Sequence, residues 1–305
     1  MNCRRSMKRQ CPDSECSSRS SHPNSGHIVR KGSYFRPSDG QHIPRFLCRS
    51  CGRTFSSARW LANYRQKKRK LNHPLRLLLS SGVSQRRAAI LLRVNRKTVV
   101  RKFRFLAEQA RIEHARWLRQ FEERRLSFIQ FDDLETSEHT KCKPLSVSLA
   151  VEPGSRKILG FQVSQMPAKG LLAKVAFEKY GPREDLRPRG WNDLFLSLKP
   201  LVKPDARWLS DENPHYPRHL KRHHPKAEHL TTPGGRGCIA GQGELKKLVF
   251  DPLFALNHTC AMLRAHMNRL FRRTWCTTKT RQGLIDHLSI YVRYHNEVLT
   301  GPCTG

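Results

Sequence analysis

Apolar and polar residues alternate along three stretches near the middle of the chain, at residues 126–133, 143–153 and 157–165. A period of two residues is typical of β-strands that bury one face. The residues GSRK at 154–157 separate the last two stretches and favour a hairpin turn. The pattern therefore predicts an antiparallel meander of three strands.

Helical spacing of apolar residues follows the meander. We expect a helix at residues 190–202, a strand that ends at Asp211, a short helix, and a strand at residues 227–232. A long helix is expected from Asp251, its cap, through Trp275, with Pro252 in the first turn, and a last helix at residues 281–296. This order of elements is that of an RNase H-like α/β domain, in which helices flank a mixed sheet.

Residues 75–105 predict three short helices separated by two turns. Gly82 ends the first helix, and Ser84 and Asn95 are expected N-caps of the second and third. This spacing is typical of a helix-turn-helix, whose third helix suits the major groove of DNA. A helical hairpin with a solvated charged face is the alternative. Four basic residues are expected on the outward side of the third helix: Arg96, Lys97, Arg101 and Lys102.

Two cysteine pairs lie before these helices, Cys11 with Cys16 and Cys48 with Cys51. Four thiolates in two short turns are enough for one closed tetrahedral zinc site. Gly52 follows the second pair, where a turn with positive φ is expected. The short polar and apolar segments between the pairs suit the small sheet of a zinc ribbon, whereas four unrelated buried thiols are the alternative.

The chain carries a large excess of basic residues, and this excess bears directly on its function. The chain of 305 residues has 58 Lys and Arg against 24 Asp and Glu, and 31 of the basic residues fall in residues 1–125 with only 7 acids. This excess predicts a polyanionic partner, for which nucleic acid is the commonest candidate. No apolar run approaches the roughly 20 residues of a membrane span, and the first residues lack a signal-peptide core. We therefore expect a cytoplasmic, nucleoid-associated protein that binds double-stranded DNA, with its cysteines reduced or metal-bound.

Acids are few, so their position at strand ends is informative. Asp132 and Asp133 close the first strand of the meander, and Asp211 closes the fourth strand, which lies beside it in an RNase H-like sheet. Carboxylates at neighbouring strand ends can hold hard divalent cations such as Mg²⁺ or Mn²⁺. Two such ions can activate an attacking hydroxyl and stabilise the leaving oxygen of a phosphodiester.

Several motifs, in this order, resemble a known family over nearly the whole chain. A ribbon that ends in CRSCGRTF and a helix-turn-helix precede FDD, SDENPHYP and LRAHMNRLFRRTWCTTKT. They resemble transposases of small bacterial insertion sequences, the class with a zinc ribbon ahead of a DDE-type domain, typified by insertion sequence one. The resemblance implies a multi-domain α+β chain: a zinc ribbon at 1–60, a helix-turn-helix and connector helix at 61–125, and an RNase H-like catalytic domain at 126–300.

The resemblance also implies roles for residues. Asp132 corresponds to the first catalytic acid and Asp211 to the second, while Asp133 falls where such enzymes often have a supporting acid. Mg²⁺ or Mn²⁺ would be the catalytic ion, structural Zn²⁺ would occupy the ribbon, and a homo-oligomer would assemble on DNA. Basic residues of the long helix would face bound DNA, although a solvated face is the alternative: Arg264, Arg269, Arg272 and Arg273. Trp208 and Trp275 are expected to be core aromatics.

The chain departs from the family pattern at the third acid, where Asn257 stands in place of glutamate. An amide oxygen can ligate a metal but brings no charge. Three interpretations remain open: a site with two aspartates and an asparagine, replacement of the glutamate by a nearby group such as His258, Asp251 or Glu244, or impaired catalysis. The last favours a second hypothesis, a transposase-derived DNA-binding regulator. Asn257 as an ordinary surface amide is also open.

Overall fold

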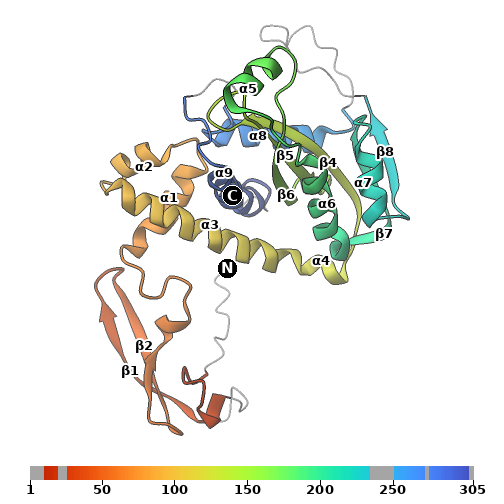
Figure 1. The fold of residues 1–305 in the computed structure, drawn as a ribbon. Helices are drawn as coiled ribbons and strands as arrows, with labels where there is room; N and C mark the ends of the chain where they lie inside the picture. Colours follow the sequence, from red (N-terminus) through yellow and green to blue (C-terminus); the bar gives the residue numbers. More distant parts are fainter. Residues whose placement is uncertain (1–9, 20–25, 234–250, 272–274, 302–305) are drawn as a thin grey trace. The chain divides into compact units, whose positions relative to one another are not determined.

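The chain divides into two units, residues 1–74 and 75–305 (Figure 1). The computed structural model describes residues 10–19, 26–233, 251–271 and 275–301. The three helices of the expected helix-turn-helix share the second unit with the larger sheet, except that the first of them begins at Asn72, just before the boundary. The division into three domains, expected from the sequence, stays a prediction.

The first unit contains a three-stranded antiparallel sheet of order β1-β2-β3. Strands β2 and β3 bring Phe46 opposite Phe55, with ring centroids 5.8 Å apart. These rings pack with Cys11, Cys16 and Cys48 in a small buried core. The elements are η1 (Ser17–Arg19), β1 (Ile28–Arg36), β2 (Gln41–Cys48), β3 (Thr54–Ser56), η2 (Ser57–Trp60) and η3 (Arg69–Leu71).

The second unit is built on a mixed five-stranded sheet of order β6-β5-β4-β7-β8. Strands β4, β5 and β6 pair antiparallel, which confirms the predicted meander, whereas β4, β7 and β8 run parallel. The strands are β4 (Leu126–Ser137), β5 (Pro144–Val151), β6 (Ile158–Gln165), β7 (Val202–Asp211) and β8 (Glu228–Thr232).

Helices cover both faces of this sheet because its strands carry apolar side chains on both sides. Ile129 and Phe131 pack on one face against α6 and α7, and Leu134, on the other face, packs against α8 and α9. The helices are α1 (Asn72–Leu79), α2 (Gln85–Leu91), α3 (Arg96–Leu118), α4 (Gln120–Glu123), α5 (Leu172–Tyr180), α6 (Arg187–Leu198), α7 (Tyr216–His223), α8 (Phe254–His266) and α9 (Arg281–Tyr294). The short elements are η4 (Lys199–Leu201) and the π-helix η6 (His295–Leu299).

The second and third helices begin where the sequence predicts. Ser84 accepts a hydrogen bond from the backbone of Arg87 at the start of α2, and Asn95 accepts one from Lys97 at the start of α3. Their apolar sides form a core with Ile290 of α9. The third helix of the helix-turn-helix and the connector helix, which the sequence predicts separately, form one continuous helix of 23 residues, α3.

The predicted long helix from Asp251 to Trp275 is wrong in extent. Helix α8 ends at His266 because Met267 adopts an extended backbone, and a tight turn follows in which the Leu270 amide donates to the Met267 carbonyl. Trp275 is 99% exposed, so its expected place in the core is wrong, while Trp208 is fully buried as predicted. Helix α5 was not expected.

Candidate active site

Asp132 and Asp211 lie on two adjacent parallel strands, just beyond the last residue pair that joins these strands. Asp211 is the last residue of β7, as predicted, but the prediction that Asp132 and Asp133 close the first strand is wrong, because β4 continues along β5 to Ser137. Strands β4 and β7 pair from Phe128 with Arg207 through Gln130 with Leu209, an offset of 79 residues that also relates Asp132 to Asp211. Burial, followed by the negative charge of Asp211, raises the pKa of Asp132 to about 7. The two carboxylates are therefore close enough to repel each other.

Residues that follow β7, in the loop and at the start of α7, hold these carboxylates in place. The Tyr216 hydroxyl donates to Oδ1 of Asp132 at 3.2 Å, and the backbone N–H of Asn213 donates to Oδ1 of Asp211 at 3.2 Å. Tyr216 is buried at the start of α7, against Phe131. Its hydroxyl was not predicted as part of the site, although its position in SDENPHYP, shortly after Asp211, is a sequence signal.

Asp133 is bonded differently from Asp132 because successive strand residues point to opposite faces. Its carboxylate accepts hydrogen bonds from the Ser148 hydroxyl at 2.6 Å and from the Trp191 indole at 3.0 Å. Burial raises its pKa. These two donors tie the carboxylate to β5 and α6, while its expected role as a magnesium ligand beside Asp132 stays a prediction.

Gln130 fastens the start of α8 to β4. The side chain is 3% exposed, its Nε2 donates to the Pro252 carbonyl at 2.7 Å, and its Oε1 accepts from the Leu256 amide at 3.1 Å. Gln130 lies two residues before Asp132 and therefore on the same face of the strand. A polar residue inside an apolar strand pattern is the sequence signal that could have identified this clamp.

The clamp places one face of α8 along a cavity of about 590 Å³ that Asp132 also lines. Residues with helical spacing form this wall of the cavity, among them Asn257, Cys260 and Arg264. Burial, followed by the charge of Asp132, raises the pKa of Cys260 to about 12. Asp133 borders the cavity too, but its carboxylate is bonded to Ser148 and Trp191.

Asn257 has one of the expected replacement groups as its partner. Its Nδ2 donates to Oδ2 of Asp251 at 2.9 Å, while Oδ1 of Asp251 accepts from the Leu253 amide at 2.9 Å. His258 lies beside Phe254, with the two rings tilted by 39°, and is not among the described residues that line the Asp132 cavity. Glu244 lies outside the described residues.

Oxygen donors dominate the acid site, which suits a hard divalent cation. Asp132, Asp211 and Asn257 supply carboxylate and amide oxygens, the ligand types that Mg²⁺ and Mn²⁺ prefer. The half-buried carboxylates of Asp132 and Asp211, which repel each other, also suit a cation, because its charge offsets their repulsion. The donor chemistry therefore fits the ion that the resemblance implies.

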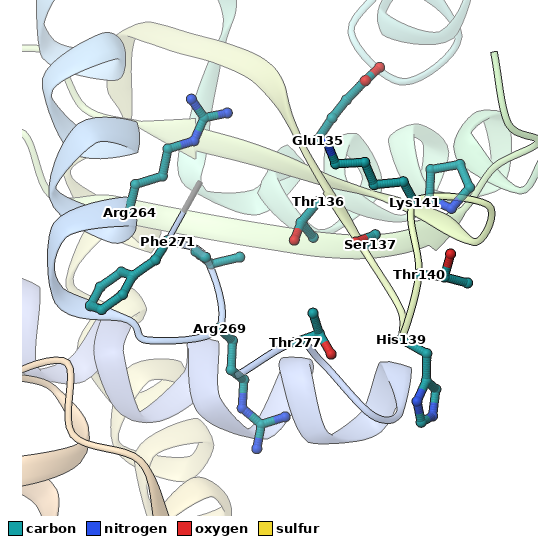
Figure 2. A pocket seen from close by; sticks show the side chains of 12 residues that line it. Glu135, Thr136, Ser137, His139, Thr140, Lys141, Arg264, Arg269, Phe271 and Thr277 are labelled. Carbon is teal, nitrogen blue, oxygen red and sulfur yellow. The ribbon is translucent and has the colours of Figure 1, made fainter. Parts of the chain in front are cut away.

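A second cavity of about 450 Å³ lies beside the first and shares Arg264 and Phe271 with it. Both Arg264 and Arg269 line this cavity together with Thr136 and Ser137 of β4, and Figure 2 shows the two arginines on the opposite side of it from these two β4 residues. Cationic and hydroxyl groups together suit oxyanions such as phosphate. Of the four arginines predicted to face DNA, Arg264 and Arg269 line this cavity, with Arg269 beyond the end of α8, and Arg272 and Arg273 lie outside the described residues.

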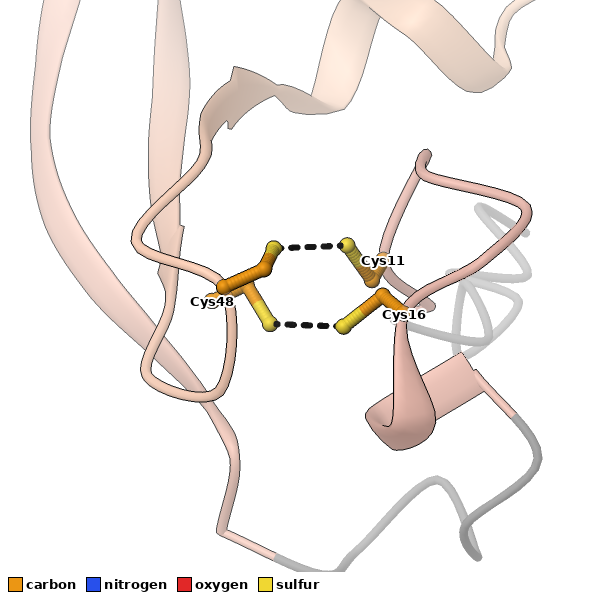
Figure 3. Close-up of side chains that lie close together, drawn as sticks. Cys11, Cys16 and Cys48 are labelled. Carbon is orange, nitrogen blue, oxygen red and sulfur yellow. Dashed lines mark hydrogen bonds between the residues drawn. The ribbon is translucent and has the colours of Figure 1, made fainter.

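The four predicted cysteines come together in the first unit. Their sulfur atoms lie within 4.8 Å of one another, with Cys11 and Cys51 at 3.5 Å and Cys16 and Cys48 at 3.7 Å (Figure 3). Zn–S bonds of about 2.3 Å in a tetrahedron require sulfur separations of about 3.8 Å. The cluster therefore has the composition and dimensions to hold a metal such as zinc, as predicted.

The local environment of these sulfurs differs from one to another. Burial raises the pKa of Cys11 to about 12. Burial also acts on Cys48, but hydrogen bonds from the Ser18 hydroxyl and from the Cys51 and Ser50 amides outweigh it and lower the pKa to about 6. Gly52 has the positive φ, 68°, that its turn was expected to need.

The basic face of α3 is smaller than predicted. Arg96, Lys97 and Arg101 are exposed, whereas Lys102 is 4% exposed and does not share their surface. A helix turns about 100° per residue, so Lys102 follows Arg101 toward the buried side near Phe103. Arg104 is exposed on the helix in its place.

Neither family models nor curated proteins give a relative for this chain. No protein-family model matches it, and no curated protein matches it significantly. Among the described residues, no helix is both long enough and apolar enough to cross a lipid bilayer. Function must therefore be argued from the sites themselves.

Proposed function

We propose that this chain is a DDE-type DNA transposase, which binds the ends of an insertion element and catalyses metal-dependent strand cleavage and strand transfer. One observation carries the proposal: Asp132 and Asp211, 79 residues apart, lie just beyond the paired part of neighbouring parallel strands, and the charge of Asp211 raises the pKa of Asp132. The strand order β6-β5-β4-β7-β8, with helices on both faces, also supports an RNase H-like domain. Two acids at this edge of such a sheet suit phosphodiester chemistry.

The chain's residues would divide the work of the reaction. Bound Mg²⁺ or Mn²⁺ would activate the attacking hydroxyl and stabilise the leaving oxygen. Asp132 and Asp211 would hold the ions, with Tyr216 fixing the Asp132 carboxylate through its hydroxyl. The amide oxygen of Asn257 would be a neutral third ligand. Water would be the nucleophile for cleavage, and the freed 3′-hydroxyl the nucleophile for transfer.

Basic surfaces would bring DNA to the acids. The exposed Arg96, Lys97 and Arg101 of α3 suit docking in a major groove. Arg264 and Arg269 line cavities beside Asp132, where phosphate contacts would fix the strand without reading its sequence. The four-cysteine cluster, loaded with zinc, would make the first unit a ribbon that adds to DNA binding.

Single-residue variants test the chemistry separately from DNA binding. Asp132→Asn and Asp211→Asn should each abolish Mg²⁺-dependent nicking and joining of DNA that carries the element's own ends, with end binding retained. Asp205→Asn, which removes an exposed acid at the opposite end of β7, is the matched control and should keep activity. Full nicking and joining by both site variants would refute the proposal.

A DNA-binding regulator without catalysis is the second candidate, and Asn257 is the observation that favours it. A neutral residue at the third ligand position lowers the negative charge available to hold cations. Nicking of supercoiled DNA in Mg²⁺ or Mn²⁺, by a preparation that binds DNA, separates the two. If neither wild-type protein nor the Asn257→Glu variant cuts while both bind DNA, the regulator is correct.

A further inference from the structure

We infer that Asp251 is a positioning residue for Asn257, and that it turns the amide so that its oxygen serves as the third metal ligand. The inference rests on the proposed function, because it concerns the same metal site. It explains how a chain with asparagine in place of an acid can complete that site. It also assigns a role to Asp251 other than direct replacement of the missing glutamate.

The orientation of the amide follows from hydrogen-bond chemistry. A carboxylate only accepts hydrogen bonds, whereas an asparagine amide has one donating and one accepting end. Nδ2 of Asn257 lies 2.9 Å from Oδ2 of Asp251, so the donating end is held by Asp251. The accepting Oδ1 is then the end left for a cation, and an amide in the reverse orientation would oppose oxygen to oxygen.

Asp251 is itself fixed and therefore can act as a reference point. Its other oxygen, Oδ1, accepts from the Leu253 amide at 2.9 Å, in the turn just before α8. The same turn is fastened to β4, because Gln130 Nε2 donates to the Pro252 carbonyl. Both oxygens of Asp251 thus have defined partners at the anchored start of the helix.

Asn257 lies on the correct side of α8 to use this orientation. The residues of α8 that line the Asp132 cavity recur at helical intervals and begin with Asn257. Gln130 binds the Leu256 amide directly beside it and lies on the same strand face as Asp132. The strand that carries the first acid therefore also sets the position of the third ligand.

A mutant cycle distinguishes a positioning role from a direct one. In Asp251→Asn, the new side chain offers both a donor and an acceptor, so the Asn257 amide can bond to it in either orientation. In Asn257→Glu, both carboxylate oxygens can ligate, and no orienting partner is needed. Asp251 should therefore matter in the wild-type background and not in the Asn257→Glu background.

The measurement is Mn²⁺ binding by the full-length, zinc-loaded chain without DNA, followed through the electron paramagnetic resonance signal of free Mn²⁺. Asp251→Asn should weaken binding about 10- to 100-fold, as removal of a ligand's outer partner usually does. In the Asn257→Glu background, Asp251→Asn should leave Mn²⁺ affinity within about threefold of its value or raise it. The reason is that this change removes a negative charge that repels the new carboxylate at position 257. Asp205→Asn should bind as wild type does, and urea unfolding should show that every variant is folded.

The outcomes are distinct for the inference and for the proposed function. An equal loss of Mn²⁺ affinity in both backgrounds would mean that Asp251 ligates the ion itself or acts through charge alone, and would overturn the inference only. Unchanged affinity in Asp251→Asn would overturn it as well. Absence of a Mn²⁺ site in both the wild type and Asn257→Glu would overturn the inference together with the proposed metal chemistry.

Discussion

Neutralising Asp132 should remove a pH-dependent loss of stability from the folded chain. The pKa of this carboxyl is raised from 3.8 to about 7, first by burial and then by Asp211. The folded state therefore binds a proton that the unfolded state has released between about pH 4 and pH 7. Stability that is present below pH 4 is lost as the pH rises through 7, because folding then keeps two neighbouring carboxylates charged.

The size of the effect follows from the shift. A change of about three pKa units at about 1.4 kcal/mol each gives about 4 kcal/mol, which is an upper bound because the carboxylate borders an open cavity where water screens it. In Asp132→Asn this contribution is absent at every pH. We therefore expect the variant to be as stable as wild type near pH 4 and more stable at pH 8.

Urea unfolding in metal-depleted buffer with stoichiometric zinc measures this difference from pH 4 to pH 8. The difference between variant and wild type isolates Asp132, since the other titrating groups are common to both chains. Asp205→Asn, a matched loss of an exposed acid, should follow wild type. Added Mg²⁺ should stabilise wild type at pH 8 and not the variant. Parallel pH curves for Asp132→Asn and wild type would refute the raised pKa of Asp132.

Three further predictions concern other parts of the chain. Cys48→Ser should abolish the thiolate absorption that Co²⁺ gives in the four-cysteine cluster, while Cys142→Ser, outside the cluster, should keep it; equal spectra would contradict the metal site. Arg101→Gln should reduce the slope of log binding constant against log salt concentration by about one phosphate contact, whereas Lys174→Gln on α5 should leave that slope unchanged. Equal slopes for Arg101→Gln and wild type would exclude α3 from the DNA interface. Trp191→Phe should lower the free energy of unfolding of the second unit by about 1–3 kcal/mol in urea, because the Asp133 carboxylate loses a buried donor. Trp60→Phe, which changes an exposed ring of the first unit, should leave that unfolding transition unchanged. An unaltered transition in Trp191→Phe would contradict the structural role of Asp133.

Periodicity was sufficient to predict the sheet that positions the acids. The alternation along β4, β5 and β6 gave the meander, and the caps Ser84 and Asn95 gave the starts of α2 and α3. These features depend on local chemistry, either a repeating pattern or a side chain that bonds its own backbone. The cysteine pairs were equally local in spacing, and their four sulfurs meet.

The contacts that shape the site depend on residues far apart in the chain and could not be predicted in this way. The bond between Trp191 and Asp133 spans 58 positions, and Gln130 reaches Pro252 across 122. Helical spacing also continues past His266, where Met267 ends α8, so the sequence pattern overestimated the helix. Lys102 shows the same limit, since a basic run on a helix does not show which of its members the packing will bury.

Anomalous diffraction from crystals of the full-length chain soaked in Mn²⁺ tests the central claim most directly. The account predicts an anomalous peak within about 2.5 Å of carboxylate oxygens from both Asp132 and Asp211, lost in crystals of Asp132→Asn. Asn257 Oδ1 should face that peak. Full Mn²⁺ occupancy elsewhere on the chain, with no peak between these two aspartates, would contradict it.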